Sequence, residues 1–127
     1  MITISHLRKE FGSVIPLKDV NAEIAKGEVI SVIGPSGTGK STLLRAINML
    51  DPPTSGQIFI DGEEITAKGC DLARVRRKMG MVFQSFNLFN HMNVIDNITY
   101  GPTRLLGLSR EEAEARAREL LKTVYLP

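Results

Sequence analysis

A glycine-rich motif lies in the first third of this chain, at Gly34-Pro35-Ser36-Gly37-Thr38-Gly39-Lys40-Ser41-Thr42. It fits the phosphate-binding pattern of a glycine, four residues, Gly-Lys, and then Ser or Thr. Glycines let the backbone curl so that successive N–H groups point at phosphate oxygens. Lys40 supplies a mobile positive charge, and the Ser41 hydroxyl can ligate a Mg²⁺ ion that bridges those phosphates. The stretch therefore predicts a phosphate-binding loop.

The residues on either side of the loop support this prediction. Residues 28–33 form an almost continuous apolar run rich in β-branched side chains, as expected for a parallel strand buried on both faces. After the loop, apolar residues recur at helical spacing, namely Leu43, Leu44, Ile47 and Leu50. A strand, a glycine loop and a helix in this order are the context that the motif requires, and the helix adds its positive N-terminal end.

The composition fits one ordinary soluble domain. The chain has 127 residues, of which 43% are hydrophobic and 24% are charged, so it can bury a core of its own. Its net charge of +2 is too small to indicate nucleic acid or an anionic membrane as a partner. Cys70 is the single cysteine, which excludes an internal disulfide. Because the sequence lacks a membrane-length apolar run and a signal-peptide pattern, we expect an intracellular chain.

Alternation of apolar and polar residues predicts two half-buried strands before the loop, at residues 2–5 and 20–25. Phe11 falls in the polar connection between them, and an isolated aromatic there is more typical of a core anchor than of a ligand site. After the loop, Asp61-Gly62 between short apolar runs predicts a hairpin over residues 57–65. A turn at this pair is favoured over a magnesium-binding role for Asp61.

Asp71 predicts the start of a helix that runs to Met79. Its basic residues are Arg74, Arg76, Arg77 and Lys78. We interpret them as a solvated helix face, and a phosphate-binding lid or a nucleic-acid patch remains the alternative. Residues 80–83 then predict another buried strand, which ends at Gln84.

The C-terminal third combines an apolar loop with a capped helix. The loop carries Phe86, Leu88, Phe89 and Met92 among polar residues, which indicates packing under another part of the protein or contact with a partner. Ser109 and Glu112 form a capping-box pattern that predicts the start of the last helix. Its predicted apolar stripe is Ala113, Ala117, Leu120, Leu121 and Val124, and its predicted ion pairs are Glu112–Arg116 and Glu114–Arg118.

Two long stretches resemble a known family. GPSGTGKSTLLRAINMLDPPTSGQIFIDGEEI and RRKMGMVFQSFNLFNHMNVIDNI are similar to the nucleotide-binding subunits of ABC transporters, and most similar to the ATPases of bacterial polar amino-acid importers. The resemblance covers essentially the whole chain. It implies an α/β fold of the P-loop NTPase type with an antiparallel β-subdomain. Within 1–127, it assigns about 1–84 to the β-subdomain and P-loop core, and about 85–127 to the Q-loop and the start of a helical subdomain.

The resemblance also implies cofactors, site residues and partners. ATP and Mg²⁺ would be bound by residues 34–42, with Phe11 stacked on the adenine ring and Lys40 acting on the phosphates. Ser41 and Gln84 would ligate Mg²⁺, and Gln84 would also touch the attacking water. The loop 85–92 would receive the transmembrane permease subunits, and a second ATP-binding subunit would complete a head-to-tail dimer. The protein would lie peripherally on the cytoplasmic side of the inner membrane, and no nucleic acid is expected.

Several parts of the family pattern are absent from this sequence. The Leu-Ser-Gly-Gly-Gln signature, the apolar strand that ends in Asp-Glu and the later switch histidine do not occur, and Asn90 stands where relatives often have proline. We therefore expect the first half of a longer ATPase, truncated before the signature and the second magnesium-site strand, which binds ATP but does not hydrolyse it alone. The alternatives are a small-molecule P-loop kinase with residues 74–78 as its lid, and a DNA-maintenance ATPase of the same superfamily.

Overall fold

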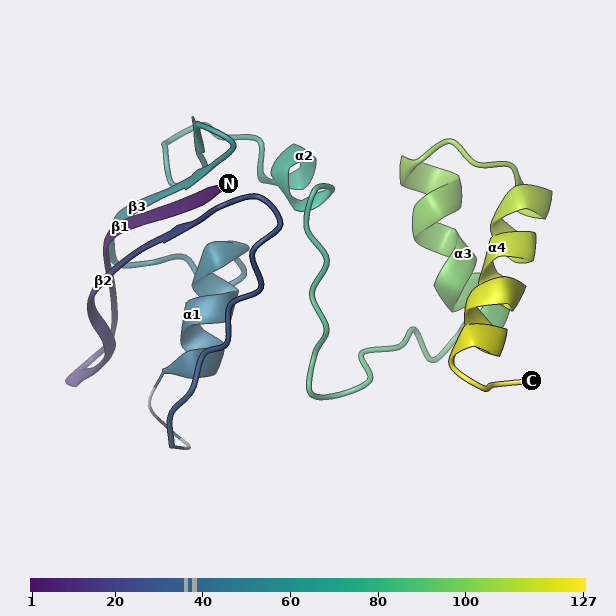
Figure 1. Cartoon of the computed structure of the whole chain (residues 1–127), viewed down its shortest axis with the longest axis horizontal. Coiled ribbons are helices and arrows are strands. Elements are labelled where there is room, and N and C mark those ends of the chain that lie inside the picture. The colour runs from purple at the N-terminus through teal and green to yellow at the C-terminus, as the bar shows by residue number, and fades with distance from the viewer. Residues whose placement is uncertain (36, 38) are drawn as a thin grey trace. The chain divides into compact units, whose positions relative to one another are not determined.

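The computed structural model describes residues 1–35, 37 and 39–127, which form two compact units, Met1–Gly80 and Met81–Pro127. Figure 1 shows the elements of both. The first unit contains β1 (Ile2–Phe11), β2 (Val14–Ile24), α1 (Lys40–Ile47), β3 (Ser55–Ile60), β4 (Glu63–Glu64) and α2 (Leu72–Arg76). The second contains α3 (Val94–Leu105) and α4 (Arg110–Thr123).

The four strands form one antiparallel sheet in the order β2-β1-β3-β4. β1 and β2 are longer than predicted, because Phe11 pairs with Val14 and the predicted polar connection is mostly strand. The register between β1 and β2 shifts after Ile4, where His6 has a φ of 50°. Gly56 of β3 lies against this bulge, since a Cβ at Gly56 would overlap the His6 carbonyl oxygen.

The hairpin predicted at Asp61-Gly62 is confirmed. It joins β3 to β4 with φ angles of 50° at Asp61 and 81° at Gly62, both in the left-handed region that such a turn requires. The N-terminal ammonium of Met1 donates a hydrogen bond of 2.9 Å to the Asp61 carboxylate, and this bond lowers the pKa of Asp61. The Asp61 carboxylate is therefore paired with the N-terminus of the chain.

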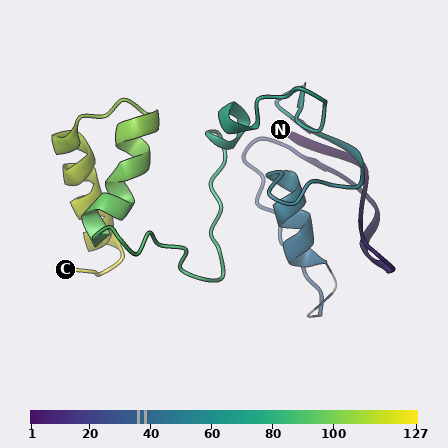
Figure 2. The same cartoon turned by 180° about the vertical axis from the view of Figure 1, so that it is seen from behind.

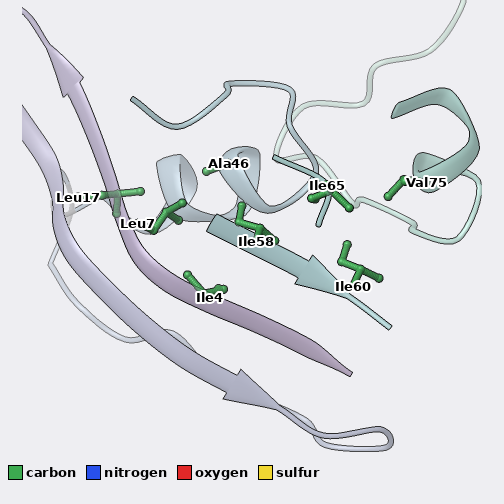
Figure 3. Packing of buried hydrophobic residues seen from close by; sticks show 8 residues of the cluster. All are labelled: Ile4, Leu7, Leu17, Ala46, Ile58, Ile60, Ile65 and Val75. Atoms are coloured by element: carbon green, nitrogen blue, oxygen red, sulfur yellow. The ribbon is translucent and has the colours of Figure 1, made fainter. Parts of the chain in front are cut away.

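The core of the first unit lies between the sheet and α1, and both cartoon views show the helix beside the sheet (Figures 1 and 2). Figure 3 shows the buried cluster, which consists of Ile4, Leu7, Leu17, Ala46, Ile58, Ile60, Ile65 and Val75. Ala46 is the buried residue of α1, whereas Leu44 and Leu50 of the predicted apolar face are exposed. Leu50 lies outside the helix, because α1 ends at Ile47 and the chain turns at Met49, where φ is 61°.

The prediction of buried strands at residues 28–33 and 80–83 is wrong. Neither segment is a strand, and Val29 and Val82 are 95% and 98% exposed. A strand forms only where neighbours accept and donate its backbone hydrogen bonds. Within the residues that the structure describes, no strand pairs with either segment.

The helix predicted from Asp71 to Met79 begins as expected but is shorter. The Asp71 carboxylate accepts a hydrogen bond from the Arg74 N–H, so the predicted cap is confirmed, and α2 ends at Arg76. The Arg74 guanidinium pairs with Glu63. Arg76 donates to the carbonyls of Asn48 and Met49 at 3.0 and 2.9 Å. These two arginines therefore support the fold of the first unit.

The second unit is a pair of helices, of which α3 was not predicted. The capping box of α4 is confirmed, with Ser109 and Glu112 exchanging hydrogen bonds. Ala113 and Ala117 of the predicted stripe are buried, but Leu120 and Val124 are exposed. The predicted ion pairs are replaced by Arg110–Glu114 and Arg116–Glu119. No helix in the described part of the chain combines the length and apolar character needed to cross a bilayer.

Candidate nucleotide-binding site

The glycine loop leads directly into α1, whose N-cap is Gly39 with a φ of 94°. Glycine has no side chain to cap the helix, and the first turn of α1 carries no acidic residue. The first N–H groups of the helix therefore keep their partial positive charge for an anion. Gly37 also has a positive φ, of 82°. Ser36 and Thr38 of the predicted loop lie outside the described residues.

Lys40 folds back over its own loop. Its ammonium donates hydrogen bonds to the carbonyl of Gly34 and, at 3.0 Å, to that of Pro35. An ammonium carries three N–H donors on a flexible stem. The same group can hold the shape of the loop and exchange partners for phosphate oxygens, as the sequence pattern predicts.

The end of the loop packs closely against β2. A Cβ at Gly39 would lie 2.8 Å from the carbonyl oxygen of Pro16, which is closer than real Cβ atoms approach backbone oxygens. Glycine is therefore required at this position for space as well as for φ. Pro16 is two residues from Val14, the strand partner of Phe11. The fold thus brings the strand pair that carries Phe11 to the start of α1.

Phe11 lies at the end of β1 with 46% of its surface exposed, which fits a ligand platform better than a core anchor. The Lys9 ammonium lies 4.9 Å from the centre of its ring. Lys9 also donates to the Pro52 carbonyl at 2.7 Å and pairs with Asp51 at 3.4 Å. This contact was not predicted from the sequence, although Lys9 and Phe11 are two residues apart on one strand and therefore share a face.

The oxygen atoms around the loop fit a magnesium ion held largely by phosphates. Ser41 is exposed in the first turn of α1, and Thr42 beside it is half-buried. Mg²⁺ in phosphate sites takes only one or two protein oxygens, with phosphates and water completing its shell. A single exposed hydroxyl satisfies that requirement. Within the described residues, no group of three or more His, Cys, Asp or Glu side chains could hold a metal by itself.

Gln84 belongs to the second unit and is exposed in a segment without regular secondary structure. Its assignment to Mg²⁺ and water stays a prediction. The loop 85–92 that follows is also exposed apart from Met92, which is half-buried. Phe86 and Leu88 are 93% and 61% exposed, so both side chains are accessible, and contact of this loop with a partner stays a prediction.

The chain is similar to known ATP-binding transport proteins. The family model described as ABC transporter matches residues 17–127. The glutamine transport ATP-binding protein GlnQ of Escherichia coli is 46% identical over 99% of the chain, and the arginine transport ATP-binding protein ArtM of Bacillus subtilis is 45% identical over 99%.

A solved structure shows the same likeness in three dimensions. The dimeric post-hydrolysis structure of the ATP-binding cassette MJ0796, bound to ADP and Pi, is 36% identical with a TM-score of 0.88. The match covers 100% of this chain and 58% of the MJ0796 chain. The chain spans about half the length of the curated relatives it matches, 52% of both GlnQ and ArtM. With most of its residues matched by the family model, the chain belongs to the ABC transporter family.

Proposed function

We propose that residues 34–42 bind the phosphates of ATP with Mg²⁺, and that the chain is part of an ATPase subunit that powers import of polar amino acids. The observation that carries the proposal is the Lys40 ammonium folded over a glycine loop whose helix has no side-chain cap. The positive charge of Lys40 and the N-terminal end of α1 lie at the same loop, an arrangement that favours an anion. The relatives named for glutamine and arginine transport support the substrate class.

In this proposal each site residue has one task. Backbone N–H groups of the loop and of the first turn of α1 hold the phosphates, and Lys40 offsets the charge that develops as the γ-phosphoryl group leaves. Phe11 stacks on the adenine ring. Ser41 and Gln84 would hold Mg²⁺, which supplies charge neutralisation when bound.

The proposed partners follow from the family and from the exposed surface. Permease subunits bind at the loop 85–92, where Phe86 and Leu88 are exposed. A second ATP-binding subunit completes the site as a head-to-tail dimer, and the solved relative is itself dimeric. We place the assembled subunit on the cytoplasmic face of the membrane. A kinase lid at residues 74–78 finds no support, because Arg74 and Arg76 are bonded within the first unit.

The test is a comparison of two lysine variants by calorimetric titration with Mg·ATP. Lys40→Ala is expected to weaken binding by about tenfold or more, since a hydrogen bond to a charged group is worth about 1.5–3 kcal/mol. Lys68→Ala removes the same charge from an exposed position in the same unit and is expected to bind like the wild type. Equal affinities in the Lys40 and Lys68 variants would refute the proposal. Circular dichroism checks that both variants are folded.

A further inference from the structure

One side chain holds the loop that precedes α3. Asn97 lies in the first turn of α3 and is half-buried. Its Oδ1 accepts a hydrogen bond of 2.8 Å from the Phe89 N–H, and its Nδ2 donates one of 3.2 Å to the Phe89 carbonyl. The side-chain amide therefore pairs with both backbone groups of a single residue, as a neighbouring strand would.

The same amide reaches two more carbonyls. Nδ2 also donates to Met92 at 3.2 Å and to Asn93 at 2.9 Å. Because a primary amide has two N–H donors, one of them is shared between two carbonyls. The Phe89 carbonyl accepts a further bond from the Met92 N–H at 3.1 Å, which closes a turn. The backbone from Phe89 to Asn93 is thus tied to the first turn of α3.

Exposed apolar side chains lie on this fixed backbone and directly before it. The Phe89 ring lies 5.9 Å from His91 and 6.3 Å from Tyr100, centre to centre, and is still half exposed. Phe86 and Leu88, which precede it, are also exposed. Since these residues bury little apolar surface, polar bonds rather than a core must order the loop.

We propose that Asn97 is a positioning residue that pre-orders residues 89–92, the second half of the loop 85–92, for its partner. This inference rests on the proposed docking role of that loop. Ordering a loop before binding removes part of the conformational entropy that binding would otherwise cost. In the described residues, the hydrogen bonds of the Asn97 side chain all fall within residues 89–97. Loss of Asn97 therefore lowers affinity for the partner and leaves the affinity of residues 34–42 for ATP unchanged.

Replacement by aspartate separates this role from simple support of the helix. Asn97→Asp keeps an acceptor for the Phe89 N–H but loses the donors and brings a carboxylate toward three carbonyl oxygens. A carboxylate in the first turn of a helix stabilises that helix. The aspartate variant is therefore expected to loosen the loop while α3 is preserved, whereas Asn97→Ala removes every bond of the amide.

The experiment measures amide hydrogen exchange in the 127-residue chain and its variants. In Asn97→Asp and Asn97→Ala, the amides of residues 89–93 are expected to exchange about tenfold faster or more. The exchange rates of the α4 amides and the affinity for Mg·ATP are expected to stay unchanged. Asn90→Ala is the matched control, because Asn90 is exposed in the same loop and its side chain makes no hydrogen bond within the described residues.

Two results of the hydrogen-exchange experiment would overturn the inference. Unchanged exchange of residues 89–93 in both Asn97 variants would show that the amide does not order the loop. Faster exchange throughout α3 and α4 in Asn97→Asp would show a general effect on stability. Either result leaves the Lys40 comparison untouched, so failure of the inference and failure of ATP binding are distinguishable.

The link to the partner is tested in the assembled transporter with a cysteine at Leu88. The parent chain, whose cysteine is Cys70, serves as the blank. Asn97→Asp is expected to lower the crosslink yield to the permease severalfold relative to Asn90→Ala. An undiminished yield despite a loosened loop would overturn the positioning role. If Leu88→Cys gives no crosslink at all, the docking role of the loop is refuted, and the inference that rests on it falls with it.

Discussion

Replacement of Gly39 by alanine separates two reasons for glycine in the phosphate loop. Gly39 and Gly37 both have positive φ, at 94° and 82°. An L-residue in the left-handed region costs about 1–2 kcal/mol, and both alanine variants incur this cost. Only at Gly39 does the added Cβ meet an atom, at 2.8 Å from the Pro16 carbonyl oxygen, whereas the space around Gly37 is open.

Crowding of this kind adds about 1–3 kcal/mol, because the backbone must shift. We therefore expect destabilisation of about 1–2 kcal/mol for Gly37→Ala and about 2–5 kcal/mol for Gly39→Ala. In urea, unfolding free energy changes by about 1–3 kcal/mol per molar denaturant, so the two midpoints should differ by on the order of 1 M. The measurement is urea unfolding without nucleotide, followed by circular dichroism. Equal midpoints for the two variants would show that the approach of Gly39 to Pro16 is not tight.

Three further predictions concern the nucleotide and pH. Phe11→Ala is expected to weaken the binding of ATP several-fold more than the binding of inorganic triphosphate, because stacking is worth about 1 kcal/mol. An equal loss of affinity for both ligands would contradict stacking. The chain is expected to bind Mg·ATP without multiple turnovers in a phosphate-release assay, and turnovers that vanish in Lys40→Ala would disprove this. The hydrogen bond with His6 lowers the pKa of Asp19 from its ordinary value of 3.8. The ionised Asp19 carboxylate therefore stabilises the fold above pH 3.8, and this stabilisation is lost as the pH falls through the lowered pKa. Asp19→Asn should therefore lose less stability than the wild type between about pH 5 and 2, and urea midpoints that fall equally in both proteins would refute this.

Features set by neighbours in the sequence could be predicted. The Asp61-Gly62 turn and the Ser109–Glu112 capping box each depend on residues no more than three positions apart, and both form as expected. The start of α1 at Lys40 likewise follows from the loop pattern. For the candidate site, the sequence identified the loop, and the structure supplied the close approach of Gly39 to Pro16.

Features that depend on distant partners could not be predicted. A run such as 28–33 has the composition of a strand, but pairing depends on neighbours that its own residues do not specify. Arg76 bonds to carbonyls 27 and 28 residues earlier, at the end of α1. α3 was missed for another reason, because Pro102 lies inside the helix and interrupts the signals by which a helix is recognised.

The sheet has two edges, and each is poorly suited to pair with a strand from another molecule. At one edge β4 has only two residues, Glu63 and Glu64, both negatively charged. At the other, β2 contains Pro16, which has no N–H to donate, and its register with β1 is irregular. Short, charged, proline-containing or bulged edges resist the strand addition that begins aggregation. Self-association through these edges is therefore disfavoured, even though the chain exposes much apolar surface elsewhere.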